Sequence, residues 1–219
     1  ARDPVMSAFG LARLVVFIAS LIPLARLFWL GMNDGLSANP VEFVTRSTGT
    51  WALVFLCLSL GMTPLRRLTG WTQWIRLRRM LGLYSFFYAL LHFTLWLWVD
   101  HALDLTAMWD DVLQRPFIAA GFTAFVLLIP LAVTSTKGMM RTLGQRWVQL
   151  HKLVYVIAIA AILHYWWHKA GKNDFGTVSI YAGIVVWLLG IRLWWAWQDR
   201  RRRIKRNRNA ASATGSPVA

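Results

Sequence analysis

The sequence predicts an all-α integral membrane protein, a six-transmembrane helix bundle with both termini in the cytoplasm. Three observations lead to this fold class. Hydrophobic residues make up 57% of the 219 residues, and the mean hydropathy of the chain is +0.46. Uncharged apolar runs of helix length recur along the chain, and 24 Lys and Arg outnumber 9 Asp and Glu. High charge beside long apolar runs is typical of membrane proteins and argues against a nucleic-acid-binding protein.

Six segments are long enough to cross a bilayer, because a hydrocarbon core of about 30 Å needs roughly 20 mostly apolar residues in a helix. They are 10–31, 49–65, 80–99, 117–134, 148–167 and 177–197. The first holds Arg13, Pro23 and Arg26 and is the weakest. No small-x-small cleavage site follows it closely, so we expect a retained span rather than a signal peptide. We expect residues 1–199 to form one transmembrane domain.

The basic residues give the orientation, because Lys and Arg gather in cytoplasmic loops. Two loops and the tail hold most of them: Arg66, Arg67, Arg76, Arg78 and Arg79; Lys137, Arg141 and Arg146; and seven more from Arg200 to Arg208. The opposite loops hold seven of the nine acids. Residues 200–219 are expected to be a basic cytoplasmic tail, disordered beyond its first turn. No internal repeat is visible.

Two histidines are expected at the same depth in the membrane. His92 lies thirteen residues after Arg79, and His164 lies thirteen after His151, so each is about 20 Å above the inner boundary. Ionisable groups at such depth are functional-site candidates. The spans contain no carboxylate for a proton relay, which favours metal ligation over hydrogen-bonded packing. Imidazole is a good iron ligand, so we predict that His92 and His164 are the axial ligands of a haem.

His151 lies at the inner boundary, too far from His164 to share an iron. A second, inner haem with His151 on one side is therefore possible. The matching depth on the third span falls near Arg78, which Arg79 follows. Arginine is a poor iron ligand but pairs well with haem propionates. Plain anchoring of the helix at the inner face explains these arginines equally well.

The remaining histidines and the cysteine carry weaker signals. His101 lies beside acids in an outer loop and is expected to be solvated, whereas His168 is an alternative ligand or a partner contact. Cys57 is the only cysteine, which excludes an internal disulfide and Cys-based zinc or iron–sulfur sites. Tryptophans near the span ends are expected to be interfacial anchors.

Several motifs together resemble a known family. They are N-P-V at 39–41, R-R-x-L-G-L at 78–83, His92, T-S-T at 134–136, L-G-x-x-W-x-x-L-H at 143–151 and His164. From about Leu11 to Arg192 the chain resembles the MsrQ (YedZ) family, the haem-binding membrane subunits of the bacterial periplasmic methionine-sulfoxide reductase system. Wider relatives are the ferric reductase and NADPH oxidase transmembrane domains. Their third and fifth helices each carry two histidines, and here Arg78 stands near one of those positions.

The resemblance implies an electron conduit in the inner membrane, with one or two b-type haems held by His92, His151 and His164. Electrons would come from the quinone pool or a cytosolic flavin reductase. They would go to a periplasmic molybdopterin enzyme, MsrP, that repairs methionine sulfoxide in oxidised proteins. The chain would then be an electron-transfer subunit and not the catalytic one. FMN is implied by the family alone, because the sequence has no Gly-rich phosphate loop.

Two other function classes stay open. A ferric or other metal reductase would use the same conduit with another terminal acceptor. A transporter or channel without redox chemistry is the second, although broken helices and polar midplane residues are scarce.

Overall fold

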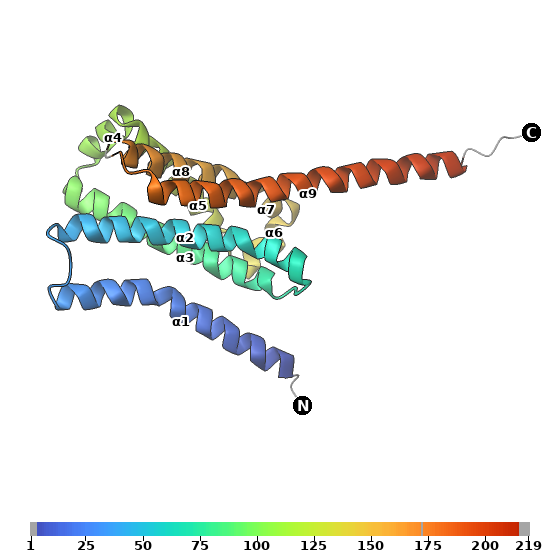
Figure 1. Ribbon diagram of the computed structural model, residues 1–219, viewed down its shortest axis with the longest axis horizontal. Coiled ribbons are helices and arrows are strands. Elements are labelled where there is room, and N and C mark those ends of the chain that lie inside the picture. The colour runs from blue at the N-terminus through green and yellow to red at the C-terminus, as the bar shows by residue number, and fades with distance from the viewer. Residues whose placement is uncertain (1–3, 172, 215–219) are drawn as a thin grey trace, which may run out of the picture.

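The computed structural model describes residues 4–171 and 173–214, and all regular structure in these residues is helical (Figure 1). The elements are α1 (Pro4–Met32), α2 (Pro40–Thr69), α3 (Trp74–Leu95), the π-helical turn η1 (Trp96–Asp100), α4 (Leu105–Gln114), α5 (Pro116–Val133), α6 (Lys137–Leu143), α7 (Gln145–Leu150), α8 (Leu153–Ala170) and α9 (Gly176–Thr214). Six described stretches are long and apolar enough to cross a membrane: Phe9–Met32, Pro40–Thr69, Trp74–Asp100, Pro116–Val133, Gln145–Ala170 and Gly176–Asn207. The six predicted spans are therefore confirmed.

Helix α2 extends well beyond the predicted span 49–65, because its polar first turns are stabilised by local capping. The Asn39 side chain accepts a hydrogen bond from the Glu42 backbone N–H at 3.1 Å, and Pro40 occupies the first turn. Both features are typical of a helix start. At the other end Gly70 adopts φ 72°, the left-handed conformation that closes many helices.

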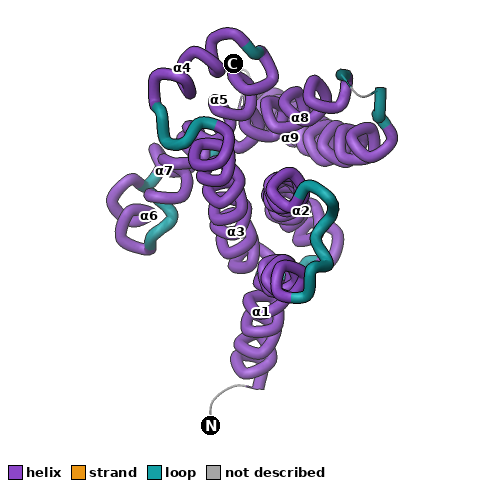
Figure 2. The backbone as a smooth tube through the Cα atoms, turned by 90° about the vertical axis from the view of Figure 1, so that its left-hand side faces the viewer, coloured by secondary structure: helices purple, strands orange, loops and turns teal. Residues whose placement is uncertain are grey.

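The helices pack as two close pairs, α2 with α3 and α5 with α8, and α9 lies beside α8 and α2. Figure 2 shows the bundle nearly end on, with α1 at its edge. The main core joins α2, α5, α8 and α9 around Leu60, Leu128, Ile157 and Leu188. Among the described residues, α3 and α8 are not a closely packed pair. Helix α3 belongs to one pair and α8 to the other, and the two helices face each other across the bundle.

Two tyrosines of α3 attach α1 to the bundle. The Tyr88 hydroxyl donates to the Ser20 carbonyl at 2.8 Å, and the Tyr84 hydroxyl donates to the Phe17 carbonyl at 3.1 Å. The Tyr88 side chain is fully buried beside Phe55 of α2. Hydroxyls buried in this way need an acceptor, so these bonds fix the docking of the first helix.

The basic segment differs from the expected disordered tail. Helix α9 continues to Thr214, far past the rest of the bundle (Figure 1). Extending an existing helix avoids the cost of nucleation, and Arg, Lys and Ala are good helix formers. The Arg201 guanidinium also stacks over the Trp197 ring at 3.7 Å. Residues 215–219 lie outside the described residues.

Candidate functional site

His92 of α3 and His164 of α8 meet inside the bundle. Their ring centres lie 6.0 Å apart, and the ring planes are 76° apart. An imidazole nitrogen binds a metal at about 2 Å, so two rings that hold one ion from opposite sides have centres about 6 Å apart. The observed separation fits two axial ligands of one iron.

Each ring is oriented by a backbone carbonyl. His92 Nδ1 lies 2.8 Å from the Thr45 carbonyl oxygen, and His164 Nδ1 lies 2.7 Å from the Phe117 carbonyl oxygen. A carbonyl only accepts, so Nδ1 of each ring carries the proton and donates. This leaves the lone pair on Nε2, the arrangement common among metal-binding histidines.

Two glycines leave the space that the rings occupy. A Cβ added at Gly49 would lie 3.0 Å from His92 Nδ1, and one at Gly121 would lie 2.6 Å from His164 Nδ1. Both approaches are closer than ordinary van der Waals contact, so any larger residue would displace the ring. Sequence reasoning missed both glycines.

The same three-part arrangement occurs twice. Thr45, Gly49 and His92 have their counterparts in Phe117, Gly121 and His164, each 72 residues further along the chain. The sequence shows no internal repeat, but the structure repeats this geometry. The α2–α3 and α5–α8 pairs each supply a carbonyl, a glycine and an imidazole. Because the carbonyl belongs to the backbone, its residue type is free to differ, which hides the repeat in the sequence.

His151 lies at the break between α7 and α8. Its Nδ1 lies 3.0 Å from the Trp147 carbonyl oxygen, and its ring stacks on Trp147 with centres 3.8 Å apart. The Trp147 indole donates in turn to the Thr134 carbonyl at 3.0 Å. His151 Nε2 is buried and makes no hydrogen bond of good geometry among the described residues, although the Leu131 backbone interacts with the imidazole. Buried polar atoms are nearly always paired, so this nitrogen suits a ligand.

Arginines surround this inner position. Arg78 of α3 interacts electrostatically with His151 and Tyr155, and Arg79 is the half-buried next residue. The sequence analysis did not select Arg192 of α9, which reaches the same region. It donates to the Leu188 carbonyl at 2.9 Å and to the Leu60 carbonyl, and its guanidinium lies 5.9 Å from the Tyr155 ring centre. An arginine inside the otherwise apolar sixth span was the available signal.

The outer histidines differ in their surroundings. The expectation that His101 is solvated is wrong, since its side chain is only 12% exposed. Its Nε2 lies 3.2 Å from an Asp111 carboxylate oxygen, and its ring packs on Trp96 with centres 4.6 Å apart. The His168 ring centre lies 5.9 Å from that of Phe117, which is 6.1 Å from that of His164. Phe117 thus joins His168 to the paired histidines.

The donor set also indicates which group fits between His92 and His164. Within residues 4–171 and 173–214, no group of three or more His, Cys, Asp or Glu side chains could hold a metal ion. A porphyrin brings four nitrogens of its own and needs only axial ligands from the protein. The two facing imidazoles therefore suit haem better than a bare metal ion.

Comparison with known proteins gives the family. The family model described as "Ferric reductase like transmembrane component" matches residues 47–162. A protein of Ralstonia nicotianae is 59% identical over 191 residues, which are 87% of this chain and 88% of the relative. One from Herminiimonas arsenicoxydans is 58% identical over 193 residues, 88% of each chain. One from Xanthomonas campestris pv. campestris is 44% identical over 214 residues, 95% of this chain and 94% of the relative.

All three relatives bear the name protein-methionine-sulfoxide reductase heme-binding subunit MsrQ. No solved structure matches the chain. Identity this high, over most of both chains, is decisive for family membership. The chain belongs to the MsrQ family, within the ferric reductase-like transmembrane proteins.

Proposed function

We propose that this protein is the haem-binding, electron-transfer subunit of a methionine-sulfoxide reductase system, with His92 and His164 as axial ligands. One observation carries the proposal: two imidazoles from separate helix pairs have centres 6.0 Å apart, each oriented by a backbone carbonyl. The names of the close relatives support the same function.

The bound group would supply reversible one-electron chemistry of iron. The chain's residues hold and shield it. Gly49 and Gly121 let the rings approach, and the Phe117 ring packs beside His164 with centres 6.1 Å apart. We assign a b-type haem, because Cys57 is the only cysteine and a C-x-x-C-H attachment cannot form.

The inner position is proposed as a second cofactor site. The buried Nε2 of His151, which makes no hydrogen bond of good geometry among the described residues, supports a ligand there. Arg78, Arg79 and Arg192 supply positive charge suited to the propionates of a second haem or to the phosphate of a flavin. FMN rests on family likeness alone.

We place the protein in the bacterial inner membrane with both termini in the cytoplasm, because its Lys and Arg gather in two loops and the basic segment of α9. The His92–His164 pair then lies toward the periplasm. Electrons would enter from the quinone pool or a cytosolic flavin reductase. They would leave to the periplasmic molybdopterin enzyme MsrP.

Haem quantitation on purified wild type and single histidine variants tests the proposal. We expect His92→Ala and His164→Ala to lose the same chromophore, and His151→Ala to affect a different one. Full, spectrally unchanged haem in both of the first two variants would contradict the assignment.

The family match also favours a second candidate, a ferric reductase with the same membrane domain. Reoxidation of the reduced protein separates the two. If the methionine-sulfoxide reductase oxidises the reduced protein faster than a ferric chelate does, the electron-transfer subunit is supported. If the chelate is faster, the ferric reductase is supported.

A further inference from the structure

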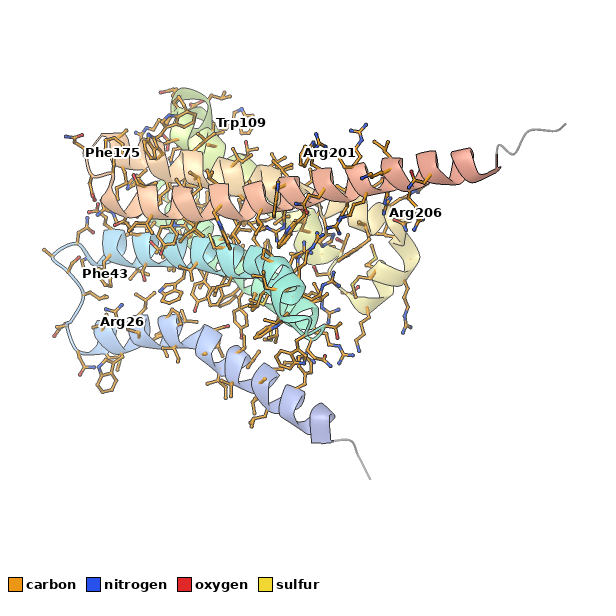
Figure 3. All side chains as sticks on the ribbon, turned by 45° about the vertical axis from the view of Figure 1, so that its right-hand side comes forward. Arg26, Phe43, Trp109, Phe175, Arg201 and Arg206 are labelled. Atoms are coloured by element: carbon orange, nitrogen blue, oxygen red, sulfur yellow. The ribbon has the colours of Figure 1, made fainter. Side chains whose placement is uncertain are left out.

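A cleft of about 590 Å³ opens at the His92 end of the bundle, apart from the haem ligands. Its walls come from α1, the following loop, α2 and α9, and its volume falls within the usual range of small-molecule sites. Figure 3 shows two of its residues, Arg26 of α1 and Phe43 of α2, near the loop that joins these helices. The other lining residues are Ser37, Glu42, Arg46, Ser47, Thr50, Trp51, Val54 and Tyr181.

The charges at the rim favour an anion. Arg26 and Arg46 both line the cleft, against one carboxylate, Glu42. Arg46 forms an ion pair with Glu42, whose carboxylate also lies 3.5 Å from the Asn39 amide. Asp174, paired with Lys169, is close enough to act on Arg46 electrostatically. The described residues provide no ion pair for Arg26, so one guanidinium is available to an incoming phosphate or carboxylate.

The two arginines lie at matching depth. Arg26 is six residues before the end of α1 and Arg46 is six residues after the start of α2, so each lies about 9 Å along its helix from the joining loop. Such a position corresponds to the boundary between headgroups and acyl chains when these helices span a bilayer.

The cleft changes from polar to apolar with depth. Along α2 its lining runs from Glu42 and Arg46 through Thr50 to Trp51 and Val54. The twelve steps of about 1.5 Å from Glu42 to Val54 cover about 18 Å of helix. A soluble anion would use only the charged rim, whereas an amphiphile with a charged head and an apolar chain would use the full length.

We propose that this cleft binds one anionic phospholipid from the leaflet at the His92 end. Arg26 and Arg46 bind its phosphodiester, the hydroxyls of Ser47 and Thr50 donate to it, and an acyl chain follows Trp51 and Val54. Arg46 already has Glu42 as a counterion, but a neutral quinone ring would leave the Arg26 guanidinium without one, so charge favours the phospholipid.

The bound lipid would stabilise the part of α2 that orients His92. Thr45 and Gly49 lie on the same turns as Arg46 and Thr50 but toward the other side of the helix. The lipid therefore acts as a structural ligand at the back of the His92 site. Its binding does not depend on haem.

Native mass spectrometry tests the proposal on protein released from nanodiscs that contain equal amounts of phosphatidylglycerol and phosphatidylcholine. We expect wild type to retain one phosphatidylglycerol. The double variant Arg26→Gln/Arg46→Gln should retain it about tenfold less, since lost charge-assisted hydrogen bonds are worth more than 1.4 kcal/mol. Arg13→Gln removes the same charge from an exposed position of α1 and should behave as wild type.

A second variant separates ligand loss from misfolding. Thr50→Trp fills the cleft while both arginines remain, and it should lose the lipid while circular dichroism stays that of wild type. Equal lipid retention by wild type and the double variant overturns the proposal. Displacement of the lipid by excess inorganic phosphate would mean a soluble-anion site, and displacement by a short-chain quinone would mean a quinone site; either overturns it.

Discussion

His92 and His164 stand 72 residues apart in the sequence, yet their ring centres are 6.0 Å apart. Each Nδ1 donates to a carbonyl 47 residues before it.

Alanine at Gly49 or at Gly121, the glycines that pack against the two imidazoles, should weaken haem binding. The added Cβ would meet His92 at Gly49 and, more closely, His164 at Gly121. Overpacking typically costs about 1–3 kcal/mol, so haem affinity should fall about fivefold to a hundredfold, and further in Gly121→Ala than in Gly49→Ala. The measurement is haem affinity by titration. Gly61 of α2 has no neighbour within 4 Å of an added Cβ, so Gly61→Ala should keep full affinity. Equal affinity in all three variants would exclude the steric role of the glycines.

Arg192→Gln should weaken the inner site and spare the outer one. The change removes a guanidinium next to Tyr155 and its hydrogen bond to the Leu60 carbonyl. In a redox titration followed by absorbance, Arg192→Gln should lose the same redox transition that His151→Ala removes.

The matched control for this arginine is Arg67→Gln at the same end of the bundle. Arg67 forms an exposed pair with Asp199 at 3.1 Å, and such pairs contribute about 0–1 kcal/mol. The Arg67→Gln variant should give the same redox titration as wild type. A change confined to the His92–His164 component in Arg192→Gln would refute the inner assignment.

Trp147→Phe should loosen His151 without removing it. Phenylalanine keeps an aromatic face for the ring but cannot donate to the Thr134 carbonyl. The lost hydrogen bond is worth about 0.5–1.5 kcal/mol. The cofactor whose binding depends on His151 should therefore bind several-fold more weakly. Trp187→Phe, at an exposed position of α9, is the control. Wild-type binding in Trp147→Phe would show that the indole does not position His151.

Helix α1 should separate from the bundle more readily in the Tyr88→Phe variant than in the Tyr84→Phe variant. The Tyr88 hydroxyl is buried and bonded to the Ser20 carbonyl at 2.8 Å, whereas the Tyr84 bond to Phe17 is 3.1 Å. The expected loss of unfolding free energy is about 1–3 kcal/mol for the buried group. Proteolysis within the α1–α2 loop, followed by release of α1 in detergent, measures it. Greater release from Tyr84→Phe would reverse the ranking.

Labelling with a membrane-impermeant maleimide tests the orientation. In a Cys57→Ala background, Ser37→Cys lies exposed in the α1–α2 loop and Gln145→Cys lies exposed at the start of α7. We expect Ser37→Cys to react in intact spheroplasts and Gln145→Cys only after lysis. The opposite pattern would place both termini in the periplasm.

The sequence predicted the features that depend on composition and depth. Apolar runs of sufficient length located all six spans. Counting thirteen residues at a fixed rise per residue paired His92 with His164, since the two helices run in the same direction.

Other features depend on packing between distant segments and leave little trace in the sequence. A glycine in an apolar helix gives no sign that an imidazole packs against it, as at Gly49 and Gly121. Arg192 stands among interfacial tryptophans, so its reach to α2 is visible only once α9 is placed. The exposure of His101 was misjudged because α4 folds back over it and brings Asp111 close.

The twofold use of carbonyl, glycine and imidazole has a consequence for protein engineering. One hairpin contains every group that an axial half-site needs, and its mate starts from the same end of the bundle. We therefore expect one hairpin, produced as a separate chain, to assemble as a symmetric homodimer that brings two such imidazoles face to face.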